Sequence, residues 1–235
     1  MKFRHLNSFT KIKVISLIIF ILFQIYFLAI HKHDCLDLDI SPNTVVAPAL
    51  FGDNVVGQSF VAKKDGLARI DLIFTTYQRK NDRDIIFRLF QAKPRRMLVE
   101  KIFNASLLKD NLYQPIRFKP QKNVKGKKLF FELLSPAGTL DNCVAIWMNH
   151  KNIYREGEYL FKRSPEKGDL VFRVYSRRPI MTELGRIVKS GRGVFGNLWA
   201  FIIVIIFFEV TLCYLFMRLI EFIWYSIKDQ SQWKI

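Results

Sequence analysis

Aromatic side chains beside polar turns are the residues of this chain whose types and spacing first indicate a chemistry. Tyrosine and tryptophan rings stack on sugar faces, while nearby basic and amide side chains orient hydroxyl or phosphate groups. The candidates are the aromatic residues Tyr77, Tyr113, Trp147, Tyr154 and Tyr159 and the polar companions Arg79, Lys80, Arg83, Asn111 and Asn149. Core packing is the alternative for each ring, and it is favoured for Trp147, which lies in an apolar strand.

Motifs for catalysis are missing from the sequence. It contains no Walker loop, G-x-S-x-G elbow, H-E-x-x-H helix or C-x-x-C pair. His31, His33 and Cys35 are potential metal ligands, but their position directly after an apolar run also fits a solvated collar at a membrane surface. Asp71 and Asp169 are candidate carboxylates for glycan chemistry, although aspartates near turns usually cap their own backbone. We expect no catalytic residue, no metal site and no cofactor.

Two long apolar runs, residues 14–30 and 198–217, stand almost at the two ends of the chain. At about 1.5 Å per residue they reach about 26 and 30 Å, against a hydrocarbon core of about 30 Å. Backbone groups in lipid must be satisfied internally, so we expect both runs to be transmembrane helices. A cleaved signal peptide is the alternative for the first run, but its length and the poor cleavage site after Ala29 favour an anchor.

Basic residues close to the spans predict the orientation. Lys2, Arg4, Lys11 and Lys13 precede the first span, whereas acidic residues follow it. We therefore expect cytoplasmic tails at 1–13 and 218–235 and an extracytoplasmic domain at 31–176. The basic residues Arg177, Arg178, Arg186, Lys189 and Arg192 conflict with this orientation because they stand on the outer side.

Residues 177–197 have the pattern of a short basic juxtamembrane helix followed by a linker. Ile180, Leu184 and Ile187 fall on one face, flanked by Arg186 and Lys189. Such a helix would bind anionic lipid head groups, and a solvated linker is the alternative.

The second span contains a carboxylate that a plain anchor does not need. Glu209 lies near the middle of the span, where a charged group costs about 2.5–3.5 kcal/mol. Gln24 of the first span is one candidate partner, and a basic group of another membrane protein is the other.

Charge adds a restriction on partners. The chain has 37 basic and 20 acidic residues and a net charge of +17, most of it between the spans. On the outer side of a membrane such a surface meets lipid head groups or acidic glycans, so we expect no nucleic acid. A basic surface that only keeps the domain soluble is the alternative.

Between the spans the hydrophobic pattern changes to the period of two that is typical of strands. Strands are predicted at 58–62, 67–77, 84–91, 97–103, 113–118, 128–134, 143–148 and 169–176. Turn residues separate them at short intervals, and no long amphipathic helix interrupts the series. We expect an all-β, antiparallel sandwich of jelly-roll type. Cys35 and Cys143 would share its oxidising environment, either paired or as two buried thiols.

The order of several short segments resembles a known family. The segments Gln58-Ser-Phe-Val-Ala, Asp65-Gly-Leu-Ala-Arg-Ile-Asp-Leu, Asn104-Ala-Ser, Lys109-Asp-Asn, Gly126-Lys-Lys-Leu-Phe-Phe-Glu-Leu and Gly168-Asp-Leu-Val-Phe-Arg-Val-Tyr are similar to galactose-binding-like β-sandwich modules. These modules occur in prokaryotic two-span membrane proteins of cell-surface glycan assembly. The resemblance covers roughly residues 45–176, and such folds host many functions.

The resemblance implies a non-catalytic accessory subunit that binds surface glycan. Its spans would contact a membrane glycosyltransferase, a flippase or a polymerase. The alternative is a structural oligomer similar to chain-length regulators and without glycan binding, although those regulators have largely helical external domains.

Overall fold

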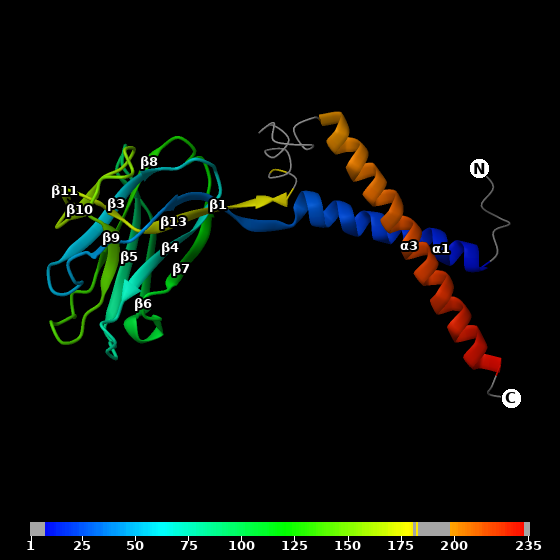
Figure 1. Cartoon of the computed structure of the whole chain (residues 1–235), viewed down its shortest axis with the longest axis horizontal. Coiled ribbons are helices and arrows are strands. Elements are labelled where there is room, and N and C mark those ends of the chain that lie inside the picture. Colours follow the sequence, from blue (N-terminus) through cyan, green and yellow to red (C-terminus); the bar gives the residue numbers. More distant parts are fainter. Residues whose placement is uncertain (1–7, 181, 183–197, 233–235) are drawn as a thin grey trace. The chain divides into compact units, whose positions relative to one another are not determined.

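The computed structural model of the chain describes residues 8–180, 182 and 198–232. One compact unit, Asp34–Arg177, is a β-sandwich, and the other contains the helices from the two ends of the chain (Figure 1). The prediction of an antiparallel sandwich between an N-terminal and a C-terminal helix is confirmed.

A seven-stranded sheet forms one layer of the sandwich. Its strands are β1 (Lys32–Ile40), β2 (Val45–Val46), β4 (Leu67–Thr75), β7 (Tyr113–Gln121), β9 (Ala145–Asn149), β12 (Asp169–Leu170) and β13 (Phe172–Pro179). Their order is β1-β13-β4-β9-β12, with β2 paired to β9 and β7 paired to β4. Ser176 pairs with Leu67 at the start of β4, so the loop after β4 lies at the end of the sandwich opposite to the one where β13 leaves it.

A six-stranded sheet forms the other layer. Its strands are β3 (Val55–Val61), β5 (Asp84–Gln91), β6 (Arg96–Asn104), β8 (Lys128–Leu134), β10 (Tyr159–Phe161) and β11 (Ser164–Glu166). Their order is β11-β10-β3-β8-β5-β6, and neighbouring strands pair in antiparallel register. A short 3₁₀ helix, η3 (Ala105–Leu107), follows β6.

Alternation along the strands separates the core from the surface. In β8, Leu129, Phe131 and Leu133 are fully buried. The Phe131 ring lies 5.4 Å from the Phe172 ring of the other sheet and 6.0 Å from that of Phe87. Each fully buried ring contributes about 2–3 kcal/mol through removal of apolar surface from water, and this packing holds the layers together.

Strand β1 was not predicted, and it corrects the interpretation of residues 31–35 as a solvated collar. Cys35 and Ile40 are buried, and two aspartates of the strand form ion pairs with other strands of the sheet. Asp39 pairs with Arg173 at 3.0 Å, and Asp34 pairs with Arg69 at 3.5 Å. These partners are far away in the sequence, so the local pattern gave no sign of the strand.

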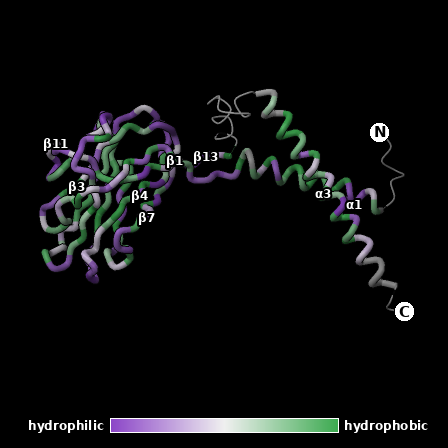
Figure 2. The backbone as a smooth tube through the Cα atoms, in the orientation of Figure 1, coloured by the Kyte–Doolittle hydropathy of each residue, from purple (hydrophilic) through white to green (hydrophobic). Residues whose placement is uncertain are grey.

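The terminal helices fit the two apolar runs. α1 (Ser8–Ile25) continues as the π-helix η2 (Tyr26–Ile30), and α3 (Leu198–Gln232) contains the second run. Figure 2 shows hydrophobic residues along both helices. Among the described residues one helix is long and apolar enough to cross a membrane, Ile203–Ser226, which extends beyond the predicted end at residue 217.

Two other predictions concern the juxtamembrane helix and the pairing of two cysteines. The basic helix predicted at 177–197 falls mostly outside the described residues, while Arg177 and Arg178 belong to β13. Cys143 is a free thiol whose Sγ donates to the carbonyl of Leu140 at 3.3 Å. No disulfide therefore joins it to Cys35.

Candidate functional site

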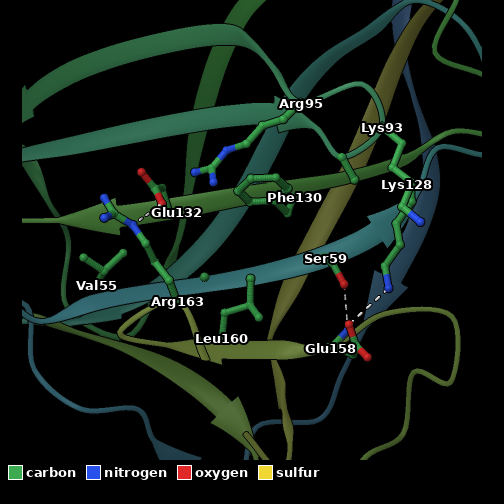
Figure 3. A pocket seen from close by; sticks show the side chains of 12 residues that line it. Val55, Ser59, Lys93, Arg95, Lys128, Phe130, Glu132, Glu158, Leu160 and Arg163 are labelled. Atoms are coloured by element: carbon green, nitrogen blue, oxygen red, sulfur yellow. Dashed lines mark hydrogen bonds and ion pairs between the residues drawn. The ribbon is translucent and has the colours of Figure 1, made fainter. Parts of the chain in front are cut away.

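A pocket of about 320 Å³ lies on the outer face of the six-stranded sheet. Its lining comes from strands β3, β8 and β10, from the turn between β5 and β6, and from the residues that flank β10. The lining residues are Val55, Gly57, Ser59, Ala92, Lys93, Arg95, Lys128, Phe130, Glu132, Glu158, Leu160 and Arg163. We call it the outer-sheet pocket, and Figure 3 shows its side chains.

The hollow follows from small residues on the central strand. Gly57 and Ser59 of β3 point outward, between the larger outward residues of the neighbouring strands. A Cβ atom on Gly57 would come within 2.5 Å of the carbonyl oxygen of Phe131, so the strands approach too closely here for any side chain. Glycine inside a strand often marks such an approach or a ligand site.

The ring of Phe130 forms the floor of the outer-sheet pocket at one side. Phe130 stacks on Phe90 with ring centroids 4.8 Å apart and an interplanar angle of 12°. The guanidinium carbon of Arg95 lies 5.5 Å from the Phe90 centroid and 5.6 Å from that of Phe130. An apolar ring with a cation beside it offers both a stacking face and a donor for a polar ligand.

Carboxylates supply the acceptors of the pocket. Glu132 is only 3% exposed, and its Oε2 lies 3.4 Å from Nε of Arg163 while its Oε1 lies 3.7 Å from a guanidinium nitrogen of Arg88. At the other end Glu158 accepts from Nζ of Lys128 at 3.1 Å. Figure 3 shows the side chains of Arg95 and Arg163 extending toward Glu132 from opposite sides.

These groups together can contact a polar ligand. Each pocket carboxylate pairs with a basic side chain, and its oxygen atoms are hydrogen-bond acceptors. In the part of the chain that the structure describes, no three His, Cys, Asp or Glu side chains gather closely enough to hold a metal ion. The pocket offers a stacking surface, acceptors and cations.

Five of the predicted site residues gather at one end of the sandwich, away from the outer-sheet pocket. The guanidinium of Arg79 lies 5.0 Å from the centroid of Tyr77 and donates to the carbonyl of Leu140 at 3.2 Å. Trp147 Nε1 donates to Oδ1 of Asn111 at 2.7 Å. The amide of Asn111 donates to Phe74 at the end of β4, which places it beside the loop that carries Tyr77, Arg79 and Lys80.

A second hollow of about 540 Å³ lies at this end of the sandwich. Its lining residues are Thr76, Arg79, Lys80, Asn81, Asp82, Ala105, Ser106 and Leu108. None of them is aromatic, so the hollow provides polar contacts without a stacking face. Tyr77 and Trp147 lie near it but do not line it. For this reason we favour the outer-sheet pocket as the candidate binding site.

The other predicted aromatic residues lie elsewhere. Tyr113 is on the outer face of the seven-stranded sheet, where the guanidinium of Arg173 lies 3.9 Å from its ring centroid. Tyr154 is buried, and its hydroxyl accepts from the amide of Val61 at 3.1 Å and donates to Glu156 at 3.3 Å. Its ring packs edge-on against Phe172, so Tyr154 is a core residue.

Gln24 and Glu209 are not joined in the structure. Among the described residues no hydrogen bond connects Gln24 with Glu209, and Nε2 of Gln24 is buried without a partner. The two helices contact each other through other residues: Lys13 forms an ion pair with Glu221, and the rings of Phe20 and Phe216 stack at 4.2 Å. Contact through Gln24 or Glu209 stays a prediction.

Sequence signals for the outer-sheet pocket were present but were not used. Lys128, Phe130 and Glu132 alternate with buried residues, which puts an aromatic ring between two charges on the solvent face of one strand. Gly57 is the one residue of strand β3 without a side chain. A comparison of the chain with models of known protein families matches none of them, and a comparison with curated proteins also finds no match.

Proposed function

We propose that this protein is a membrane-anchored, non-catalytic accessory subunit that binds surface glycan in the outer-sheet pocket during polysaccharide or glycoconjugate assembly. The observation that carries the proposal is the half-buried ring of Phe130, stacked on the buried Phe90, in a hollow whose two carboxylates each pair with a basic side chain. Sugar rings stack on such faces, while their hydroxyl groups donate to carboxylates and accept from basic side chains. A jelly-roll, galactose-binding-like character of the sandwich belongs to the same proposal.

The anchor in this proposal is a pair of antiparallel spans with both chain ends in the cytoplasm. α3 contains the apolar stretch Ile203–Ser226. The contacts Phe9 with Trp224, Lys13 with Glu221, and Phe20 with Phe216 run in opposite directions along the two helices. A helix that packs antiparallel along a membrane span lies in the same membrane, which supports the assignment of α1 as the first span.

A partner in the membrane is the third part of the proposal. Glu209 lies within the apolar stretch of α3, where a carboxylate needs a polar partner. We propose that a glycosyltransferase, flippase or polymerase supplies that partner. Cross-linking from position 209 in native membranes, followed by identification of the captured protein, tests this; capture of the same chain alone would favour a homo-oligomer.

Glycan binding is tested by titrating the full chain in zwitterionic nanodiscs with oligosaccharides of the host surface glycan. In wild type we expect saturable heat of binding. In Phe130→Ala we expect the binding affinity to fall about tenfold or more, because stacking contributes on the order of 1–2 kcal/mol. Phe130→Leu keeps an apolar side chain but removes the flat ring, so it should also weaken binding. Trp147→Phe is the matched control at the other end of the sandwich.

The outcomes separate the two candidate surfaces. Weakened binding in both Phe130 variants, with unchanged thermal unfolding, supports the outer-sheet pocket. Loss of binding only in Trp147→Phe would move the site to the end with Tyr77, Arg79 and Asn111. An absence of binding by wild type to neutral and acidic oligosaccharides alike contradicts the proposed function.

A further inference from the structure

The outer-sheet pocket has more positive than negative charge. Its lining contains the cations Lys93, Arg95, Lys128 and Arg163 and the anions Glu132 and Glu158, so four positive charges face two negative ones and leave +2. Lys128 pairs with Glu158, and Arg163 pairs with Glu132. The excess positive charge therefore belongs to Lys93 and Arg95. In the described part of the chain neither of these two residues has a carboxylate partner.

The turn that carries these two cations is fixed to the sheet. The side-chain amide of Gln91 donates to the carbonyl of Lys93 at 2.8 Å, and the amide of Ala92 donates to the carbonyl of Lys128 at 3.0 Å. Arg95 lies against the Phe90 and Phe130 rings. Since stacking on a ring leaves the edge of the guanidinium open, its donors stay free for a ligand.

The position of Arg95 relates the charge to the stacking floor. A sugar ring placed on Phe130 would have Arg95 at its edge, so a charged substituent of that sugar would meet the open donors. Figure 3 shows the guanidinium of Arg95 on the Glu132 side of Phe130 and the side chain of Lys93 on the opposite side of the ring, beside Lys128. The acceptors for hydroxyl groups and the free cations thus flank the same ring.

We infer that the ligand is an acidic saccharide whose carboxylate or phosphate is bound by Arg95, with Lys93 adding positive charge to the same pocket, while its ring stacks on Phe130. This inference rests on the proposed function and adds the chemical class of the glycan. Guanidinium binds carboxylate and phosphate through two parallel hydrogen bonds, and Lys93 adds a point charge. A neutral sugar would gain the stacking and hydroxyl contacts but would leave both cations without an anion.

The test compares a uronic-acid oligosaccharide with its carboxyl-reduced, neutral form, both titrated into the full chain in zwitterionic nanodiscs. Wild type should bind the acidic form about tenfold or more tightly, since one charge-assisted contact is worth on the order of a factor of ten. The double variant Lys93→Gln/Arg95→Gln should lose this preference, because its affinity for the acidic form should fall more than its affinity for the neutral form. Higher salt should reduce the preference in wild type.

A charge-matched control is Lys119→Gln/Lys122→Gln, which removes two positive charges at and just beyond β7, in the other sheet. It should keep the wild-type preference. Equal affinity of wild type for both oligosaccharides, or an unchanged preference in the Lys93→Gln/Arg95→Gln variant, overturns the inference and leaves glycan binding standing. No binding of either oligosaccharide overturns the proposed function as well.

The phosphate of a lipid head group is the other anion that Arg95 and Lys93 could bind. Vesicles that contain phosphatidylglycerol provide that arm of the test. Vesicle binding that disappears in the Lys93→Gln/Arg95→Gln variant, without any binding of the acidic oligosaccharide, would assign the anion to lipid and overturn the saccharide inference.

Discussion

Gln58 and Asp169 join the two sheets through a hydrogen bond inside the sandwich. Nε2 of Gln58, on β3, donates to Oδ1 of Asp169, on β12, at 3.0 Å, and both side chains are fully buried. The amide of Leu170 donates back to Oε1 of Gln58 at 2.9 Å. The orientation of the Gln58 amide is therefore fixed from both ends.

Asp169→Asn should destabilise the sandwich by about 2 kcal/mol, because a donor would face the donor of Gln58. Oδ2 of Asp169 accepts from the amides of Ile153 and Tyr154 at 2.7 and 2.8 Å, so an asparagine oxygen would keep that side and turn its nitrogen toward Gln58. The side-chain amide of Gln58 cannot rotate to compensate without losing the hydrogen bond that it accepts from the amide of Leu170. Burial raises the pKa of Asp169, and removal of that charge offsets only part of the loss.

The measurement is thermal or denaturant unfolding of the full chain in detergent. Asp141→Asn is the control, since the same change is made on an exposed side chain. The double variant Gln58→Glu/Asp169→Asn restores an acceptor opposite each donor and should recover part of the lost stability. An Asp169→Asn protein as stable as wild type would contradict the role of this bond.

The strands of the sandwich were predictable where burial alternates strictly. The prediction at 84–91 coincides with β5 and that at 128–134 with β8. Asp169 was expected to cap a turn, but its donors come from residues 153 and 154 and from Gln58, which no local pattern reveals. Strand β1 was missed for the same reason, because Arg69 and Arg173 hold its aspartates across the sheet.

The candidate binding surface was less predictable than the fold. Sequence reasoning selected aromatic residues beside turns, and the structure does bring Tyr77, Asn111 and Trp147 to one end. Whether a strand side chain faces a hollow depends on the residues across from it in register. Phe130 lies over a hollow only because Gly57 and Ser59 stand outward on β3, and this pairing joins segments far apart in the chain.

Gly57→Ala should destabilise the protein by about 2 kcal/mol or more. The added Cβ atom would stand 2.5 Å from a backbone oxygen of Phe131, and relief requires that β3 and β8 move apart. Gly52→Ala is the matched control. Its φ of +52° makes alanine cost about 1 kcal/mol, but there is open space around the position. A smaller effect at position 57 than at position 52, measured by the shift in unfolding midpoint, would show that the strands tolerate the atom.

Asp65 should contribute to stability above its ordinary pKa of 3.8 and lose that contribution in acid. Hydrogen bonds from the amides of Lys125 and Val124, at 3.0 and 2.8 Å, lower the pKa of its carboxyl group. The unfolded chain therefore takes up this proton at a higher pH than the folded one, and stability falls as the pH drops from 3.8 through the lowered value.

Asp65→Asn removes this proton uptake and should make the unfolding midpoint less dependent on pH between about pH 4 and pH 2. At neutral pH it should cost at most about 1 kcal/mol, because the group is exposed and the amide oxygen can still accept. Exposed Asp53 provides the control substitution Asp53→Asn. A pH profile of Asp65→Asn identical to that of wild type would show that the two backbone bonds do not differ between the charged and neutral carboxyl group.

Phe20→Cys/Phe216→Cys should form a cross-link within one chain in membranes. The two rings stack at 4.2 Å with an interplanar angle of 7°, so thiols at these positions come within reach of a short bifunctional reagent. The background replaces Cys35, Cys143 and Cys213, so that the new thiols alone react. Phe20→Cys/Phe207→Cys is the control, because Phe207 is 73% exposed on α3.

Proteolysis in the sandwich distinguishes the possible products of this reaction. A cross-link within the chain keeps the N-terminal and C-terminal fragments together after cleavage, which supports the antiparallel pair of spans. Products of twice the chain mass from Phe20→Cys/Phe216→Cys would mean that α1 meets α3 of a neighbouring copy. That result would favour the oligomeric scaffold. The helix surfaces that the proposed accessory subunit would use to contact its partner would then pack against another copy of the chain.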